Sequence, residues 1–410
     1  MQFNKESGKL IKHIIPNIKK IGVYKSIDTN LRLKNSLEKI MLLLYDEINQ
    51  ANIFVKKNIS TTLHPTLTEK IITPGIYGGK YFPHNIKTYI DEKLKYQLIY
   101  QQRFGKKTFK IIFGLTNDND IQNIDKFNQH AEFVFSWLYI CHKFSLDTCS
   151  KTLSIYIYLT PFKKKLPMDN KTIISSQHVN TGVTYHCKSD NELIVYRKEE
   201  WKKVFIHETF HSFGFDFIDN NAKKIQDYVK SIFPVKSDFL ICEAYTETWS
   251  RILNAAFCSY YSLKNINDKE NYILYTMFAL QCERIFSIMQ MKKVLKFMNM
   301  DYADLTNVHD LKCETLRKMY KEDSNVLSYF VVTGLFMNDF HNFLLWCTKN
   351  NTNLFRFSMS TYNIDSFVKF IKEQYENPEL RPAIDHLNIN YSDKQKFLLY
   401  TLRMTCIETK

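Results

Sequence analysis

The chain has 410 residues, of which 45% are hydrophobic, and a formal net charge of +14. This composition can build a full core with two or three structural units, and no internal repeat or low-complexity tract interrupts it. No apolar run approaches the ~18–20 residues that cross a bilayer, so we expect no membrane span.

The positive charge is spread over separate lysine pairs such as Lys106–Lys107 and Lys292–Lys293. A basic surface attracts acidic partners, including nucleic acid and acidic protein segments. No motif indicates nucleic-acid binding, and we favour a lysine-rich composition without a dedicated partner.

Residues 1–105 are expected to form an N-terminal helical or cover region. One clear helix is predicted from Asn30 to about Val55 and is followed by a stretch that contains glycine and proline. Met1–Ile21 is amphipathic and rich in lysine, without the uninterrupted apolar core of a secretory signal.

Nine cysteines are scattered along the chain without a C-x-x-C pair. An odd number of dispersed cysteines favours free thiols over a disulfide framework. We therefore expect the cytoplasm or another reducing compartment, or a place inside a virus particle.

A small mixed sheet is predicted in the middle of the chain. Thr108–Leu115 and Leu153–Thr160 are rich in β-branched and aromatic residues, which favours strands. The segment between them, Ile121–Phe144, has the apolar pattern of a long helix. Gly182–Cys187 and Glu192–Tyr196 predict two further short strands.

One of these strands is a candidate for binding substrate. A strand at the edge of a sheet can pair with an extended peptide backbone. We expect this role for the segment Thr181–His186, in particular for Gly182, Val183, Thr184 and Tyr185. An ordinary hairpin is the alternative interpretation.

The sequence His207-Glu208-Thr209-Phe210-His211 is an H-E-x-x-H motif. On a helix its two histidines lie one turn apart, at ~5–6 Å, and can hold one zinc ion. Glu208 can then reach a water molecule on the same metal. The motif is short, so the alternative is two polar histidines on an ordinary amphipathic helix.

The motif lies in a predicted helix that covers Arg197–Gly214. Glu199 and Glu200 would occupy its first turn, where the helix dipole favours acidic side chains. Gly214 stands where a left-handed residue would end the helix.

A second predicted helix, Phe239–Phe257, could supply a third ligand, with Ser237 or Asp238 as its cap. Its residues Glu243 and Glu247 lie one turn apart on a largely apolar helix, where two unpaired carboxylates are costly to bury. We expect Glu243 to bind the metal and Glu247 to accept a hydrogen bond from the far nitrogen of His207 or His211. The alternative is a solvated acidic edge.

H-E-x-x-H followed by E-x-x-x-E on a second helix resembles the gluzincin clan of zinc metallopeptidases, over roughly residues 108–260. The resemblance implies one Zn²⁺ ion per chain on His207, His211 and Glu243. It implies that Glu208 is the general base, that Glu247 supports a ligand, and that the substrate is a protein or peptide. The positive charge would suit an acidic one, without requiring it.

The expected fold class is α+β, with a zincin-like core that contains the small mixed sheet, the active-site helix and the glutamate helix. The core is expected at residues 106–262. Residues 263–410 are predicted to form a mainly helical lobe, with helices at Tyr272–Phe297, Asn325–Cys347 and Asn363–Tyr375. By resemblance, this lobe would supply a transition-state donor. Tyr329 is the first candidate, and His309, His341 and Tyr245 are the alternatives.

Two other functions stay open. The chain could be a catalytically silent zincin-fold module that binds a partner or builds a structure, for example in a virus particle. It could also be a metzincin-like peptidase, because Gly214 fits H-E-x-x-H-x-x-G. In that case Asp216 would be the third ligand, although it stands one position early and Phe217 occupies the ligand position.

Overall fold

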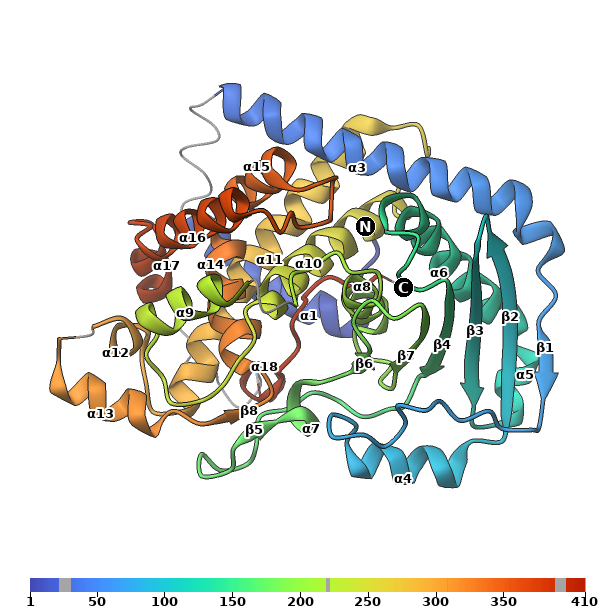
Figure 1. The fold of residues 1–410 in the computed structure, drawn as a ribbon, viewed down its shortest axis with the longest axis horizontal. Coiled ribbons are helices and arrows are strands. Elements are labelled where there is room, and N and C mark those ends of the chain that lie inside the picture. Colours follow the sequence, from blue (N-terminus) through green and yellow to red (C-terminus); the bar gives the residue numbers. More distant parts are fainter. Residues whose placement is uncertain (22–30, 219–221, 308, 388–395, 410) are drawn as a thin grey trace. The chain divides into compact units, whose positions relative to one another are not determined.

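The computed structural model describes residues 1–21, 31–218, 222–307, 309–387 and 396–409. The protein is α+β, with a mixed six-stranded sheet and many helices (Figure 1). No helix in the described ranges is both long and apolar enough to cross a membrane.

The chain divides into two compact units. The helical unit comprises Met1–Leu42, Lys164–Val179 and Phe217–Lys410, and the sheet unit comprises Leu43–Lys163 and Asn180–Asp216. This division differs from the consecutive segments 1–105, 106–262 and 263–410 that we expected. The chain leaves the helical unit and returns to it twice, which a pass along the sequence does not detect.

The six strands of the sheet unit follow one another across the sheet in an order that differs from the chain order. In space the order is β1 (Thr66–Thr68), β2 (Tyr96–Phe104), β3 (Lys107–Leu115), β4 (Thr152–Tyr158), β7 (Asp190–Val195) and β6 (Gly182–Thr184), as labelled in Figure 1. β3, β4 and β7 are parallel, whereas β1, β2 and β6 run antiparallel to their neighbours. The four strands predicted from the sequence are therefore present, within a few residues of their expected bounds.

The parallel strands β3 and β4 are joined by helix α6 (Ile124–Phe144), as a parallel pair requires a crossover. The single helix expected from Ile121 is wrong at its start. A short helix, α5 (Asp118–Gln122), comes first, and Asn123 ends it before α6 begins.

Alternating residues of β3 face two different layers, because side chains of a strand point to opposite faces in turn. Phe113 packs on Phe127 of α6, and Phe109 packs on Phe213, which follows helix α8 (Trp201–Ser212). Ile112 faces the other way, into a cluster with Ile86 of α4 (His84–Lys93). The sheet is thus covered on both faces.

Helix α3 (Leu31–Asn58) corresponds to the helix predicted for Asn30–Val55, and the boundary between the units falls within it. Asn30 itself lies outside the described residues.

The helical unit is built around α10 (Cys242–Tyr260) and α11 (Lys269–Phe297), with α1 (Lys5–Ile21) against α11. The region expected to be one helix at Asn325–Cys347 has three parts. They are a π-helical segment η3 (Leu327–Val332), α14 (Thr333–Asn338) and α15 (Phe340–Asn350).

The remaining elements are short or lie around this centre. They are η1 (Ser60–Thr62), α7 (Ser176–Val179), α9 (Lys223–Ile232), α12 (Tyr302–Thr306), α13 (Leu311–Met319), α16 (Thr361–Tyr375), α17 (Leu380–His386), α18 (Lys396–Tyr400) and the paired strands β5 (Ile174–Ser175) and β8 (Glu322–Asp323).

The expectation that the cysteines are all free thiols is wrong for one pair. Cys149 and Cys187 form a disulfide, although 38 positions separate them in the chain. The other seven cysteines are free and buried. The parallel pairing of β4 with β7 brings the two bridged loops together, and the sequence shows no local sign of it.

Candidate metal centre

Helix α8 carries the H-E-x-x-H motif and starts later than predicted. Glu200 has a left-handed backbone with φ 60°, so the helix begins at Trp201. Glu199 and Glu200 are buried in the turn before the helix and do not occupy its first turn, which corrects the predicted role.

The end of α8 lies where it was predicted. Gly214 adopts φ 64°, a conformation that glycine tolerates without a Cβ clash. The Gly214 N–H donates to the His211 carbonyl at 3.1 Å, and the Phe215 N–H donates to the Phe210 carbonyl at 2.9 Å. This is a Schellman motif, which fixes the position of His211 in the last turn.

The motif helix is buried on almost every face, which excludes the interpretation of an ordinary amphipathic helix. His207, Glu208 and His211 are each less than 10% exposed. In the middle of the motif, Thr209 accepts a hydrogen bond from the Trp137 indole of α6 at 2.6 Å. The helix is therefore anchored to the sheet unit beside its two histidines.

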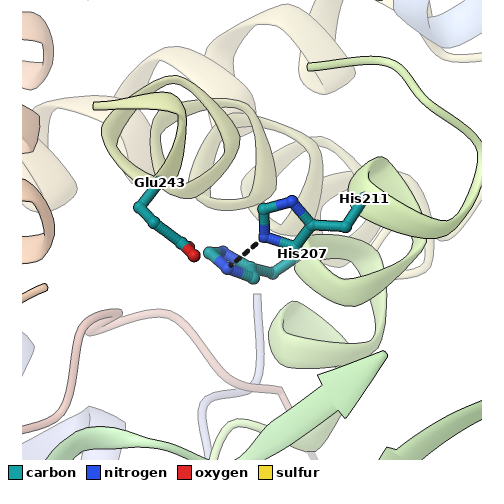
Figure 2. Close-up of side chains that lie close together, drawn as sticks. All are labelled: His207, His211 and Glu243. Atoms are coloured by element: carbon teal, nitrogen blue, oxygen red, sulfur yellow. Dashed lines mark hydrogen bonds between the residues drawn. The ribbon is translucent and has the colours of Figure 1, made fainter. Parts of the chain in front are cut away.

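The two motif histidines face each other. Their Nε2 atoms lie 3.2 Å apart, and the rings are nearly perpendicular (Figure 2). Two nitrogens on a tetrahedral zinc ion at ~2.0–2.1 Å would lie about 3.4 Å apart. The spacing of this pair thus agrees with the spacing that such an ion imposes.

Asp216 determines which nitrogen of neutral His211 carries the proton. Its Oδ2 lies 2.5 Å from Nδ1 of His211, and its carboxylate can only accept a hydrogen bond. In neutral His211 the Nδ1 atom therefore carries the proton, and Nε2 is the nitrogen whose lone pair can bind a cation.

The Asp216 side chain is fully buried, and its second oxygen, Oδ1, lies 2.9 Å from Nε2 of His186. Burial alone would raise the pKa of this carboxyl, but His211 and His186 hold the pKa below its usual value. Asp216 is thus a charged partner of His211.

This position bears on two expectations. Asp216 contacts Nδ1 of His211, whereas Nε2 faces His207, so Asp216 does not stand where a third ligand of the metzincin-like alternative would. In addition, Nδ1 of His211 has Asp216 as its partner, so Glu247 does not fill this position on His211, and its expected hydrogen bond with His207 stays a prediction.

Glu247 is fully buried and pairs with Arg251 one turn later on α10. The Arg251 Nε donates to Oε1 of Glu247 at 2.8 Å, and its other nitrogens donate to Ser287 and to the carbonyl of Tyr329. All residues of α10 are buried, so a solvated acidic edge is excluded.

The predicted caps of α10 are wrong. The helix begins at Cys242 after Ile241, without a side-chain cap. Ser237 bonds the carbonyl of Tyr320, and Asp238 pairs with Lys230, because both residues lie too far before the first turn.

Glu243 lies in the first turn of α10 and is 9% exposed. The hydroxyl of Tyr329, from the π-helical segment η3, donates to Oε2 of Glu243 at 3.0 Å. Tyr329, the candidate transition-state donor, is therefore a direct partner of the candidate third ligand.

His207, His211 and Glu243 form one group of potential metal ligands. Each offers one ligand atom, and these atoms all lie within 4.8 Å of one another. Figure 2 shows the Glu243 carboxylate directed toward the two imidazoles. Two imidazole nitrogens and one carboxylate oxygen are the donor set of many zinc sites with an open position.

The predicted edge strand lies beside Glu208. β6 is the last strand in the sheet order and includes Gly182, Val183 and Thr184, while Tyr185 follows it. A Cβ on Gly182 would lie 2.7 Å from Cγ and 2.8 Å from Oε1 of Glu208. Only glycine allows the strand to approach the motif helix this closely.

Comparison of the chain with protein-family models, with curated proteins and with solved structures found no match.

Several residues of the site were not predicted in their present roles. His186 and Arg251 were not considered, and Asp216 was considered only as a ligand. A possible signal for Asp216 is its place two residues after Gly214, where a helix end turns the chain back toward the last helical turn. Arg251 stands four positions after Glu247, the spacing of a helical ion pair.

Proposed function

We propose that this protein is a zinc-dependent peptidase. The observation that carries the proposal is the group of His207, His211 and Glu243, in which Asp216 contacts Nδ1 of His211 and Nε2 of His211 faces His207. Two imidazoles and a carboxylate, all buried, suit Zn²⁺, whereas Mg²⁺ and Ca²⁺ prefer oxygen ligands.

The buried donors also favour a cation on electrostatic grounds. Two Nε2 lone pairs that face each other at 3.2 Å repel unless a proton or a metal lies near them. The Glu243 carboxylate adds a buried negative charge, which a cation at this position would stabilise. A divalent ion would satisfy these groups together.

In the proposed reaction, His207, His211 and Glu243 would hold the metal, and a zinc ion there supplies Lewis-acid activation of water and of the substrate carbonyl. Glu208 would take a proton from the attacking water at its carboxylate and deliver it to the leaving amine. The Tyr329 hydroxyl is a donor next to Glu243 and could stabilise the negative charge that develops on the carbonyl oxygen.

Strand β6 would bind the substrate. Among the described residues β6 pairs with β7 alone, and it runs past Glu208 at Gly182. An extended peptide added to its other edge would pass the proposed base. This supports a protein or peptide as the substrate class.

The test is the cleavage of a peptide library by the full-length chain, with and without a zinc chelator. We expect cleavage that the chelator abolishes and added zinc restores. The Glu208→Gln variant should keep its zinc but lose activity by several orders of magnitude, since the amide cannot accept the proton.

The same assay separates the second candidate. A chain that binds zinc at this site but cleaves no peptide in the library would support the catalytically silent module. A Glu208→Gln variant as active as the wild type would contradict the assigned base.

A further inference from the structure

A chain of three side chains leads from the surface of the sheet unit to His211. His186, in the turn after β6, is 32% exposed at its side chain, and its Nε2 lies 2.9 Å from Oδ1 of Asp216. The other oxygen of Asp216 contacts Nδ1 of His211. Imidazole nitrogens therefore lie against both oxygens of the carboxylate.

Such a two-sided contact restricts how the carboxylate can turn. A buried carboxylate held by only one partner can rotate about its χ2 angle, and the ring that it orients can then rotate with it. With His186 in place, Oδ2 is directed at His211 and the ring plane of His211 is defined. His186 can thus influence a ligand that it does not touch.

The turn that carries His186 is itself fixed to the end of α8. The next residue, Cys187, is bridged to Cys149, and its N–H donates to the carbonyl of His211 at 3.1 Å. The disulfide packs against Gly214, where a Cβ would lie 3.2 Å from Sγ of Cys149.

Two further hydrogen bonds hold the same turn. The Ser150 N–H donates to the carbonyl of Lys188 at 2.7 Å, and the Asn191 amide donates to the carbonyl of Tyr185 at 2.8 Å. The backbone on both sides of His186 is therefore tied to the strands of the sheet.

We propose that His186 is a positioning residue that acts through Asp216 to hold the His211 imidazole for metal binding, and that the Cys149–Cys187 disulfide keeps His186 in place. This inference rests on the proposed metal site. It assigns roles to His186 and to the disulfide that the ligand set alone does not give.

The experiment is a Co²⁺ titration of the full-length, zinc-free chain, because Co²⁺ reports both affinity and ligand geometry through its visible absorption. The variants are His186→Ala, His186→Gln and Asp216→Ala. Loss of a group that orients a metal-binding histidine typically costs about 10- to 100-fold in affinity. We expect a loss of this size for His186→Ala and for Asp216→Ala, with a changed absorption spectrum.

His186→Gln provides a rescue, because its amide can donate to Oδ1 of Asp216 as an imidazole can. We expect its affinity and spectrum to lie much closer to the wild type than those of His186→Ala. The matched control is His84→Ala, an exposed histidine of α4 in the same unit, which should leave both unchanged.

The disulfide is tested with Cys149→Ser/Cys187→Ser. We expect weaker Co²⁺ binding, and the combination with His186→Ala should lose less than the sum of the two effects, because both act on the same turn. Additive losses would overturn the assigned role of the disulfide.

A His211→Ala variant distinguishes failure of the positioning role of His186 from failure of the metal site. If it abolishes Co²⁺ binding while His186→Ala binds like the wild type, the positioning role is wrong and the metal site stands. If His211→Ala binds Co²⁺ as the wild type does, both the metal site and this inference are overturned.

Discussion

The hydroxyl of Tyr329 donates a hydrogen bond to the carboxylate of Glu243, with 3.0 Å between the oxygens. The two residues are 86 positions apart in the chain. Tyr329 reaches Glu243 from a π-helical segment, a helix form that is rare and is often found at functional sites. The backbone carbonyl of Tyr329 also accepts a hydrogen bond from Arg251 at 3.3 Å.

The first prediction concerns Tyr329→Phe, which removes this hydroxyl and little else. If the hydroxyl also stabilises the developing oxyanion, peptidase turnover should fall by about 10²- to 10³-fold, while zinc stays bound. Turnover and zinc content are measured on the same preparation. Tyr245→Phe, which removes a buried hydroxyl bonded to Phe355, is the control and should keep its turnover. Equal turnover of Tyr329→Phe and wild type would contradict the proposed role.

A second prediction follows from the close approach of β6 to the motif helix. In Gly182→Ala the new Cβ would overlap Glu208, so either the strand or the carboxylate must shift. We expect a large loss of peptidase turnover with zinc retained. Gly8→Ala is the control, because a Cβ at Gly8 meets no atom within 4 Å. Full activity of Gly182→Ala would show that the strand and Glu208 are not coupled.

The buried ion pair of Glu247 and Arg251 gives a third prediction. Arg251→Met leaves the Glu247 carboxylate buried without its cation, which typically costs about 3–5 kcal/mol of folding free energy. Urea unfolding followed by circular dichroism measures this change. Lys318→Met, which breaks an exposed pair on α13, should hardly change stability. A similar small effect for Arg251→Met would mean that the buried pair contributes no more than the exposed one.

Lys293 of α11 gives a prediction about pH. Burial lowers the pKa of this amine from 10.5 to about 7, and the amine donates to the carbonyl of Thr401. Between these two values the unfolded chain binds more protons than the folded chain, so stability should rise with pH. The expected slope from this one group is about 1.4 kcal/mol per pH unit.

The measurement is the difference in unfolding free energy between the wild type and Lys293→Met from pH 7 to 10, which removes the contributions of other groups. A pH-independent difference would show that Lys293 keeps an ordinary pKa in the folded protein.

The elements of the candidate site were largely predictable from local patterns. The spacing of His207 and His211 and the end of the helix at Gly214 are local features, because residues four apart on a helix share a face. The strands Thr108–Leu115 and Leu153–Thr160 were predictable because a short run of β-branched and aromatic residues is itself a local signal for a strand.

What could not be predicted depends on contacts between distant segments. The left-handed start of α8 at Glu200 and the disulfide of Cys149 with Cys187 depend on how the strands pair. The C-terminal segment is a further case. Residues 401–407 form no helix or strand, yet all of them are buried. The Cys406 and Ile407 N–H groups donate to the buried carboxylate of Glu283. No periodic pattern marks such a segment.

The most direct test of the metal site is the zinc content of the purified full-length chain, measured beside a His207→Ala variant. We expect about one zinc per chain in the wild type, as for a site with three protein ligands, and almost none in the variant. A wild-type chain without zinc, or a His207→Ala chain with as much zinc as the wild type, would contradict this expectation.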